Sequence, residues 1–292
     1  MTDFSRVGVL GAGLMGSGIA QVTAVGGYDV VIRDVDQPAL DRGRKMIEQS
    51  LARFVEKGQL DAGRRDQALG RLTFTTELTA VAQCDLVIEA VTEDLELKNR
   101  IWAELDRLCP AGTVFASNTS SLPIVAMAAA TRRADRFIGL HFFNPPAIMA
   151  LVEVVRAVGT SQETVDRALE YVRRIGKQAV AAKDTPGFIV NRLLVPYMVD
   201  AVRAVERGVA SVADVDMGMK LGAGHPIGPL ALMDLVGLDT ALRVSDIMFE
   251  EFREAQYAAP PLLRRLVMAG HLGRKTGRGF YDYSVNPPRP AL

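Results

Sequence analysis

The 292-residue chain is predicted to adopt an α/β fold, in which a doubly wound, mostly parallel sheet precedes a smaller all-helical domain. Three observations support this prediction. Short β-rich runs alternate with helix-length segments through the first part of the chain. A glycine-rich turn joins the first apolar run to the first helical segment. Few strand signals follow residues 183–187 (K-D-T-P-G), where the pattern becomes helical.

The segment from residue 6 to residue 34 has the layout of a dinucleotide-binding βαβ unit. An apolar run, Val7 to Leu10, ends in the turn G-A-G-L-M-G. Gly11 permits the tight turn, Gly13 lets the backbone approach a pyrophosphate, and Gly16 lets the helix pack closely on its strand. The N-terminus of this helix offers free N–H groups and a positive dipole end to the phosphates.

The second β-rich run ends at Asp34, whose carboxylate can accept hydrogen bonds from a ribose 2′-hydroxyl. A helical excursion follows over about residues 37–70, longer than an ordinary crossover. It contains a long helix over about 37–57 and a second helix near 64–69. The long helix is rich in Arg and Lys, which suits either a solvated face or a polyphosphate site.

Further strands are expected at 72–75, 85–90, 113–117, 136–140, 151–155 and 178–182. We place the domain boundary near residue 184, which gives a domain over 1–184 and a helical domain over 185–292. The helix predicted from Phe188 to Glu206 is apolar on several sides, so we expect it to be buried. We expect the second domain to supply the interface of a homodimer.

Composition bounds the class of protein. The formal net charge is zero, 49% of residues are hydrophobic and 23% are charged, which indicates a soluble globular chain. Its charge gives no overall electrostatic attraction to nucleic acid or to a membrane surface. No apolar run has the length of a membrane span, and the N-terminus carries no targeting segment, so we expect a cytoplasmic protein. Cys84 and Cys109 lack redox or metal spacing, and the three histidines lack H-E-x-x-H spacing, so no metal is expected.

A histidine and a glutamate are the first candidates for chemistry. The strand expected at 136–140 delivers His141 at its C-terminal end, the edge at which open α/β sheets bind ligands. The next strand carries Glu153, which a returning strand could lay beside the imidazole. A carboxylate there fixes the tautomer and favours the protonated ring. Alone, a histidine at a strand end is more often structural.

Two polar residues have both a structural and a functional interpretation. Ser120 follows the strand at 113–117, so its hydroxyl could contact substrate or cofactor, or Ser120 or Ser121 could cap a helix from Leu122. Asn191 lies in the first turn of the second domain's apolar helix. Its amide is either a core hydrogen-bonding group or a substrate contact.

Glu93 and Lys98 follow the strand at 85–90 and could hydrogen-bond the nicotinamide side of a dinucleotide. The alternative is an exposed ion pair, which contributes little.

Taken together, these stretches resemble the (S)-3-hydroxyacyl-CoA dehydrogenase family over nearly the whole chain. The matching motifs are G-A-G-L-M-G-S-G-I-A-Q, D-L-V-I-E-A, S-N-T-S-S-L, H-F-F-N-P, L-V-E-V, D-T-P-G-F-I-V-N-R and G-R-K-T-G-R-G-F-Y-D-Y. The chain looks most like the bacterial short-chain branch that acts on 3-hydroxybutyryl-CoA. The resemblance implies a Rossmann-type NAD-binding domain and an acyl-CoA substrate, with a place in fatty-acid β-oxidation.

The resemblance also implies roles for individual residues. It makes His141 the catalytic acid/base and Glu153 its carboxylate partner. Ser120 and Asn191 match contacts to the substrate oxygen. The implied NAD contacts are Gly11, Ala12, Gly13, Leu14, Met15, Gly16, Asp34, Glu93, Lys98, Ser120, Asn144 and Lys275, and the implied CoA contacts are Ser50 and Lys57.

The chain departs from the family pattern after H-F-F-N-P. Relatives commonly continue x-P-V-M-K, whereas this chain reads Pro146-Ala147-Ile148-Met149-Ala150. The departure leaves His141 and Glu153 in register but bears on the shape of the acyl pocket. Two rival functions stay open: a dehydrogenase of a free hydroxy acid such as gulonate, and a non-catalytic crystallin-like protein. The Arg/Lys-rich helix favours CoA over a free hydroxy acid. The presence of Ser120, His141, Glu153 and Asn191 argues against a structural protein, which needs none of them.

Overall fold

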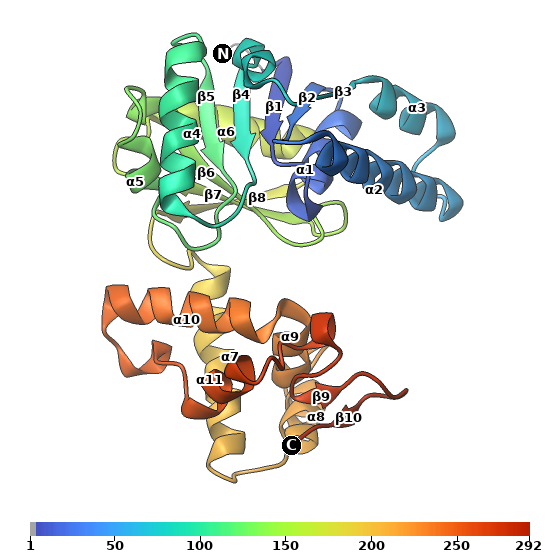
Figure 1. Cartoon of the computed structure of the whole chain (residues 1–292), viewed down its shortest axis with the longest axis vertical. Helices are drawn as coiled ribbons and strands as arrows, with labels where there is room; N and C mark the ends of the chain where they lie inside the picture. The colour runs from blue at the N-terminus through green and yellow to red at the C-terminus, as the bar shows by residue number, and fades with distance from the viewer. Residues whose placement is uncertain (1–3) are drawn as a thin grey trace. The chain divides into compact units, whose positions relative to one another are not determined.

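The computed structural model describes residues 4–292. The chain divides into two compact units, the first extending to Phe188 and the second covering Ile189–Leu292 (Figure 1).

An eight-stranded sheet forms the centre of the first unit. Its order is β3-β2-β1-β4-β5-β6-β7-β8, with β1 to β6 parallel, β7 antiparallel to β6, and β8 parallel to β7. The strands are β1 Arg6–Leu10, β2 Asp29–Arg33, β3 Leu72–Thr75, β4 Leu86–Glu89, β5 Val114–Ser117, β6 Phe137–Phe142, β7 Leu151–Arg156 and β8 Gln178–Lys183. This confirms the predicted doubly wound, mostly parallel sheet.

Helices cover both faces of this sheet because its central strands are apolar on both sides. Val7 and Val9 of β1 join a core with α1 (Leu14–Val25), α2 (Gln37–Glu56) and α6 (Gln162–Arg174). Leu10 joins the opposite core, which contains Trp102 of α4 (Leu95–Leu108), Ile124 of α5 (Ile124–Ala128) and Val81 of η1 (Leu78–Gln83). The remaining helices of this unit are α3 (Ala62–Gly70) and η2 (Ala134–Arg136).

Two local predictions are wrong in detail. The strand that carries His141 runs on to Phe142, so the histidine lies inside β6 rather than after it. No serine caps the helix after residue 120: α5 begins at Ile124, and the Asp184 carboxylate accepts from the N–H groups of Ile124 and Val125 at 2.9 and 2.7 Å. A distant carboxylate replaces the expected local cap, which sequence spacing cannot reveal.

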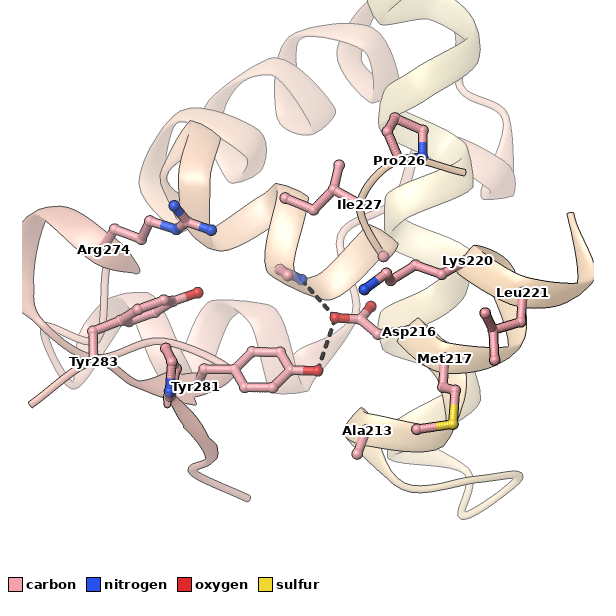
Figure 2. A pocket seen from close by; sticks show the side chains of 13 residues that line it. Ala213, Asp216, Met217, Lys220, Leu221, Pro226, Ile227, Arg274, Tyr281 and Tyr283 are labelled. Atoms are coloured by element: carbon pink, nitrogen blue, oxygen red, sulfur yellow. Dashed lines mark hydrogen bonds between the residues drawn. The ribbon is translucent and has the colours of Figure 1, made fainter. Parts of the chain in front are cut away.

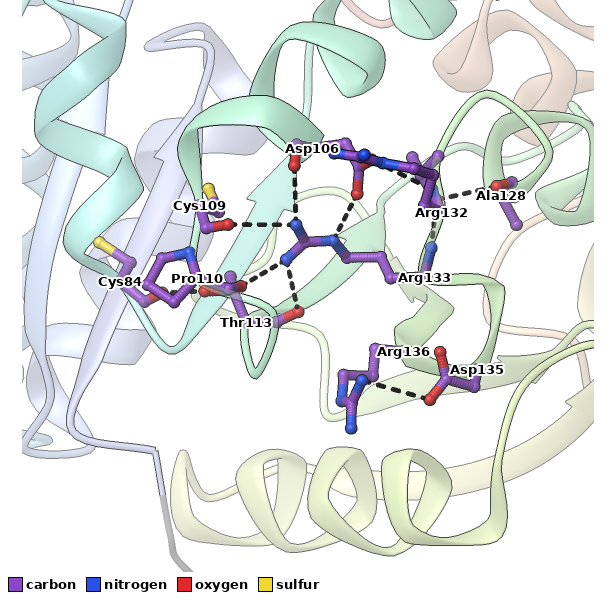
Figure 3. Close-up of polar contacts among 11 residues, drawn as sticks. Cys84, Asp106, Cys109, Pro110, Thr113, Ala128, Arg132, Arg133, Asp135 and Arg136 are labelled. Carbon is purple, nitrogen blue, oxygen red and sulfur yellow. Dashed lines mark hydrogen bonds and ion pairs between the residues drawn. The ribbon is translucent and has the colours of Figure 1, made fainter.

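A buried ion pair with its hydrogen bonds lies at the amino ends of β5 and β6 (Figure 3). It connects the segments that precede these two strands. Arg133 donates through Nε to Asp106 Oδ1 at 2.7 Å, and its other nitrogens donate to carbonyls of Asp106, Cys109 and Pro110. Its guanidinium also lies 4.5 Å from the centre of the Phe115 ring. The cluster fixes the end of α4 to the connection that precedes β6.

The second unit is helical, with one exception to the predicted all-helical domain. Its helices are α7 Val190–Glu206, α8 Val212–Gly222, α9 Pro229–Val236, α10 Leu238–Phe252, η3 Ala255–Tyr257, α11 Pro261–Met268 and η4 Arg274–Thr276. A short antiparallel ribbon, β9 Tyr281–Asp282 and β10 Arg289–Pro290, follows them. Two-residue strands give no readable alternation, so the sequence pattern missed them.

A buried carboxylate joins this ribbon to the helices (Figure 2). Asp216 of α8 accepts from the N–H groups of Leu230 and Ala231 in the first turn of α9, at 2.8 and 3.0 Å, and from the Tyr281 hydroxyl at 2.9 Å. These residues border a hollow of about 510 Å³ within the second unit. Asp216 therefore has a structural role there.

Candidate active site

The glycine turn lies where the order of the strands reverses, between β1 and β4. Gly11 has a φ of +95°, and a Cβ there would lie 2.7 Å from the Ala90 carbonyl oxygen after β4. A Cβ on Gly16 would lie 1.8 Å from the Gly11 carbonyl oxygen, so the helix start and the turn require glycine. A Cβ on Gly13 would meet no atom within 4 Å, so the backbone is open at that point. These three observations fit a bound pyrophosphate at the N-terminus of α1.

Asp34 lies beside this turn at the end of β2. Its Oδ2 accepts from the Ala12 N–H and its Oδ1 from the Val35 N–H, both at 2.6 Å. A carboxylate has about four acceptor positions, so each oxygen can also accept a ligand hydroxyl. Leu14 is exposed on the same turn and Met15 is half-buried. The arrangement suits a ribose diol, while its negative charge opposes a 2′-phosphate.

His141 and Glu153 are direct partners across β6 and β7. The antiparallel register pairs the two residues, and Nδ1 of the imidazole lies 2.6 Å from Oε2 of the carboxylate. Glu153 is 0% exposed and His141 5% exposed, so the contact is shielded from solvent. The returning strand therefore lays the carboxylate beside the imidazole, as predicted. Because Nδ1 faces Glu153, Nε2 is the nitrogen left for a substrate.

Two aromatic rings hold the imidazole. The ring of Phe143 lies 4.6 Å and that of Phe188 5.5 Å from the centre of the His141 ring. Phe188 reaches this place because Gly187 and Phe188 both have left-handed backbone, with φ of +78° and +47°. Strained conformations at non-glycine residues occur preferentially at functional sites. The Asp184 cap on α5 anchors the same loop.

Glu93 and Lys98 are not the exposed ion pair of the alternative interpretation. Lys98 is 1% exposed, and its Nζ lies 2.6 Å from Glu89 Oε1 and 3.1 Å from Glu93 Oε2. Glu93 also accepts hydrogen bonds from the Thr119 hydroxyl and, at 3.1 Å, from the Ser120 N–H. Burial alone would raise the pKa of Glu93, but Lys98 and these donors outweigh it and hold that pKa below its usual value.

The loop after β5 connects this cluster to the histidine strand. Ser120 is half-buried, and its backbone is fixed by Glu93. Asn118, which the sequence analysis did not select, accepts from the Phe142 N–H through Oδ1 at 2.9 Å. Asn144 lies exposed in the loop that follows β6. Residues of three strand ends thus converge on the carboxyl edge of the sheet.

The remaining predicted residues lie on helices. Ser50 is half-buried on α2, and Lys57 is exposed where that helix ends. Asn191 lies in the first turn of α7, in the second unit. Lys275 also belongs to the second unit, where its Nζ forms an ion pair with Asp239 at 2.6 Å. The first unit alone therefore brings together the glycine turn, Asp34, the Glu93–Lys98 cluster and the His141–Glu153 pair.

Five polar residues around the site were not predicted from the sequence: Glu89, Ser117, Asn118, Thr119 and Asp184. Among these residues, the sequence pattern could have indicated Glu89, because it is a charged residue at the end of the apolar run L-V-I-E of β4. Within residues 4–292 no group of three His, Cys, Asp or Glu side chains is arranged to hold a metal, and none of the helices could span a bilayer.

Comparisons with known proteins agree with this geometry. The NAD binding domain model of 3-hydroxyacyl-CoA dehydrogenase matches residues 6–185, and the C-terminal domain model of the same family matches 187–283. A 3-hydroxybutyryl-CoA dehydrogenase of Mycobacterium tuberculosis is 51% identical over 97% of this chain and 100% of its own. Human mitochondrial hydroxyacyl-coenzyme A dehydrogenase is 47% identical over 95% of this chain and 91% of its own. The crystal structure of (S)-3-hydroxybutyryl-CoA dehydrogenase PaaH1 from Ralstonia eutropha is 44% identical, with a TM-score of 0.94 over 97% of this chain and 100% of that one.

Proposed function

The chain belongs to the 3-hydroxyacyl-CoA dehydrogenase family and is an NAD-dependent oxidoreductase, and we propose that it interconverts (S)-3-hydroxybutyryl-CoA and acetoacetyl-CoA. The observation that carries the proposed chemistry is the His141–Glu153 pair, buried at the same sheet edge as the dinucleotide turn. Relatives named for the four-carbon substrate support the short acyl chain.

His141 performs the proton transfer in this proposal. Bound NAD would supply the acceptor for the hydride that leaves C3 of the hydroxyacyl group, and bound NADH would supply the hydride for the reverse reaction. Nε2 of His141 takes the proton of the 3-hydroxyl during oxidation and gives it to the developing alkoxide during reduction. Glu153 holds Nδ1 and stabilises the charged ring that oxidation forms and reduction consumes. Positioned proton transfer of this kind contributes about 10²–10⁴-fold to the rate.

Other residues bind and orient in this proposal. Ser120 and Asn191 contact the substrate oxygen, and Ser50 and Lys57 contact CoA. The cofactor is held by Gly11, Ala12, Gly13, Leu14, Met15, Gly16, Asp34, Glu93, Lys98, Ser120, Asn144 and Lys275. The open backbone at Gly13 and the fixed carboxylates of Asp34 and Glu93 support this assignment.

We further propose a cytoplasmic homodimer built through residues 185–292, acting in fatty-acid β-oxidation. Large apolar side chains of the second unit support the interface, because they are exposed in the single chain: Leu193, Val209, Met217, Leu221, Leu235 and Met268. A second copy of the chain would remove such side chains from water, which stabilises association. The two free, buried cysteines suit a reducing compartment.

The test is NADH oxidation with acetoacetyl-CoA, longer 3-oxoacyl-CoAs and free acetoacetate measured side by side. We expect the highest kcat/KM for acetoacetyl-CoA and little turnover of free acetoacetate. A higher kcat/KM for the longer thioesters would refute the short-chain assignment. Preference for the free acid, or for gulonate in the oxidation direction, would refute the CoA assignment.

A further inference from the structure

A fully buried carboxylate outside the residues assigned above links the two halves of the site. Glu89 ends β4 and is 0% exposed. Its Oε1 accepts from Lys98 Nζ at 2.6 Å and from the Val91 N–H at 2.8 Å, and its Oε2 accepts from the Ser117 hydroxyl at 2.6 Å. We propose that Glu89 is a positioning residue for the reaction, holding Lys98 and the 117–120 loop in their working places.

The contacts show what Glu89 holds on the cofactor side. Lys98 Nζ has two carboxylate partners, and Glu89 is the nearer, at 2.6 Å against 3.1 Å for Glu93. Because Lys98 is buried, an ammonium that loses a partner cannot recover the loss from water. Without the Glu89 charge, we expect Lys98 to move toward Glu93 or toward solvent. Either movement displaces the Glu93 carboxylate that fixes the Ser120 N–H.

Glu89 acts equally on the substrate side. The Ser117 hydroxyl that donates to Glu89 accepts from the Thr119 N–H at 3.2 Å, which fixes the start of the loop. The Glu89 carbonyl accepts from the Asn118 N–H at 2.8 Å, and the Asn118 side chain accepts from the Phe142 N–H. Phe142 is the neighbour of His141 in β6. One buried residue therefore stands between the Lys98 ammonium and the histidine strand.

This inference rests on the proposed contacts of Glu93, Lys98 and Ser120 with NAD. If it holds, Glu89→Gln should weaken NADH binding about tenfold, which corresponds to ~1.4 kcal/mol. It should also lower kcat, because the Glu89 carboxylate holds the Ser117 hydroxyl at the start of the loop that carries Ser120. NADH affinity is measured by fluorescence titration of the purified protein, and stability by its Tm, so neither depends on turnover.

Asp106 supplies a matched control. It is also a buried carboxylate in an ion pair, with Arg133, but it lies at the amino ends of the strands (Figure 3). Asp106→Asn should lower the Tm without changing NADH affinity. A purely structural Glu89 would behave in the same way, and that result overturns the proposal.

Two further variants keep the test decisive. Ser117→Ala removes one donor to Glu89 and should also weaken NADH binding, by a smaller factor than Glu89→Gln. This variant provides the test if Glu89→Gln does not fold. In a Lys98→Met background, Glu89→Gln should change NADH affinity little, because coupled residues are non-additive. Full additivity would show that Glu89 does not act through Lys98. Failure of the unmodified protein to bind NADH would instead refute the proposed cofactor site.

Discussion

Replacing each member of the His141–Glu153 pair separately tests whether the pair moves a proton. His141→Gln removes the proton carrier, and positioned acid–base transfer contributes about 10²–10⁴-fold to kcat. At 1.36 kcal/mol per factor of ten, that is about 3 to 5 kcal/mol of barrier. NADH affinity should be little changed, because the proposed cofactor contacts lie at the glycine turn and Asp34.

Glu153→Gln keeps the shape of the side chain and removes its charge. Glu153 is 0% exposed, so solvent does not screen its contact with the imidazole. A hydrogen bond to a charged group contributes about 1.5–3 kcal/mol, against about 0.5–1.5 kcal/mol between neutral groups. The difference predicts a loss of roughly tenfold in kcat for ketone reduction near neutral pH.

The same contact predicts the effect on the opposite direction of the reaction. Oxidation converts the neutral ring of His141 into the charged ring, which the buried Glu153 carboxylate stabilises at 2.6 Å. Glu153→Gln should therefore also lower kcat for oxidation of the hydroxyacyl substrate.

The assay follows NADH absorbance in both directions over the pH range in which each variant stays folded. His225→Gln is a matched control, because His225 is a loop histidine whose Nδ1 lies 3.0 Å from the Tyr197 hydroxyl in the second unit. It should keep its kcat in both directions. Near-normal turnover by well-folded His141→Gln would remove the mechanism. An unchanged kcat in Glu153→Gln would remove the role of the carboxylate charge.

Four other predictions concern binding, assembly and thiol chemistry. The Asp34 charge should give a higher kcat/KM with NAD than with NADP, and a clear NADP preference would contradict this assignment. Lys57→Ala should raise KM for acetoacetyl-CoA while NADH affinity stays constant. An unchanged KM would show that the basic side chains of α2 face solvent and do not bind CoA. Light scattering at micromolar concentration should give a dimer that Leu221→Asp weakens, whereas a monomeric parent protein would refute the interface. Burial raises the pKa of Cys84 to about 12 and that of Cys109 to about 11, so neither thiol should react with alkylating reagents near neutral pH until the protein unfolds, and rapid labelling of the native protein would contradict this.

Features that depend on neighbouring residues in the chain could be predicted from the sequence. The glycine turn is one, because the positive φ of Gly11 is a local backbone requirement and a Cβ on Gly16 would meet the nearby Gly11 carbonyl oxygen. The helix Leu95–Leu108 is another, since its apolar spacing and the Asp94 cap are local. Alternation of strands and helices gave the parallel sheet for the same reason.

Features that depend on distant partners could not be predicted. Asp184 caps α5 although it lies 60 positions from Ile124 in the sequence. The sequence around α5 therefore suggests the nearby serines as caps and contains no sign of Asp184. The burial of Lys98 depends on Glu89, which a sequence pattern shows only as the last residue of a strand. A run of charged residues or a single ion pair has the same sequence pattern whether it is exposed or buried. Only the residues that pack around it determine whether it is exposed to solvent.

The loop between His141 and Glu153 shows why the departure from the family pattern leaves the pair intact. In an antiparallel pair, a shift of one residue would carry Glu153 to the opposite face of the sheet, so the register of the two strands matters more than the residues of the loop. The register is fixed outside the loop: Phe142 N–H donates to Asn118, and a Cβ on Gly139 would lie 2.7 Å from Cβ of Val155. Within the loop, Pro146 lies so close to α1 that a Cβ on Gly18 would meet it at 2.8 Å. The displaced proline thus packs on α1, and the altered residues that follow it lie between β6 and β7, outside the strands that pair His141 with Glu153.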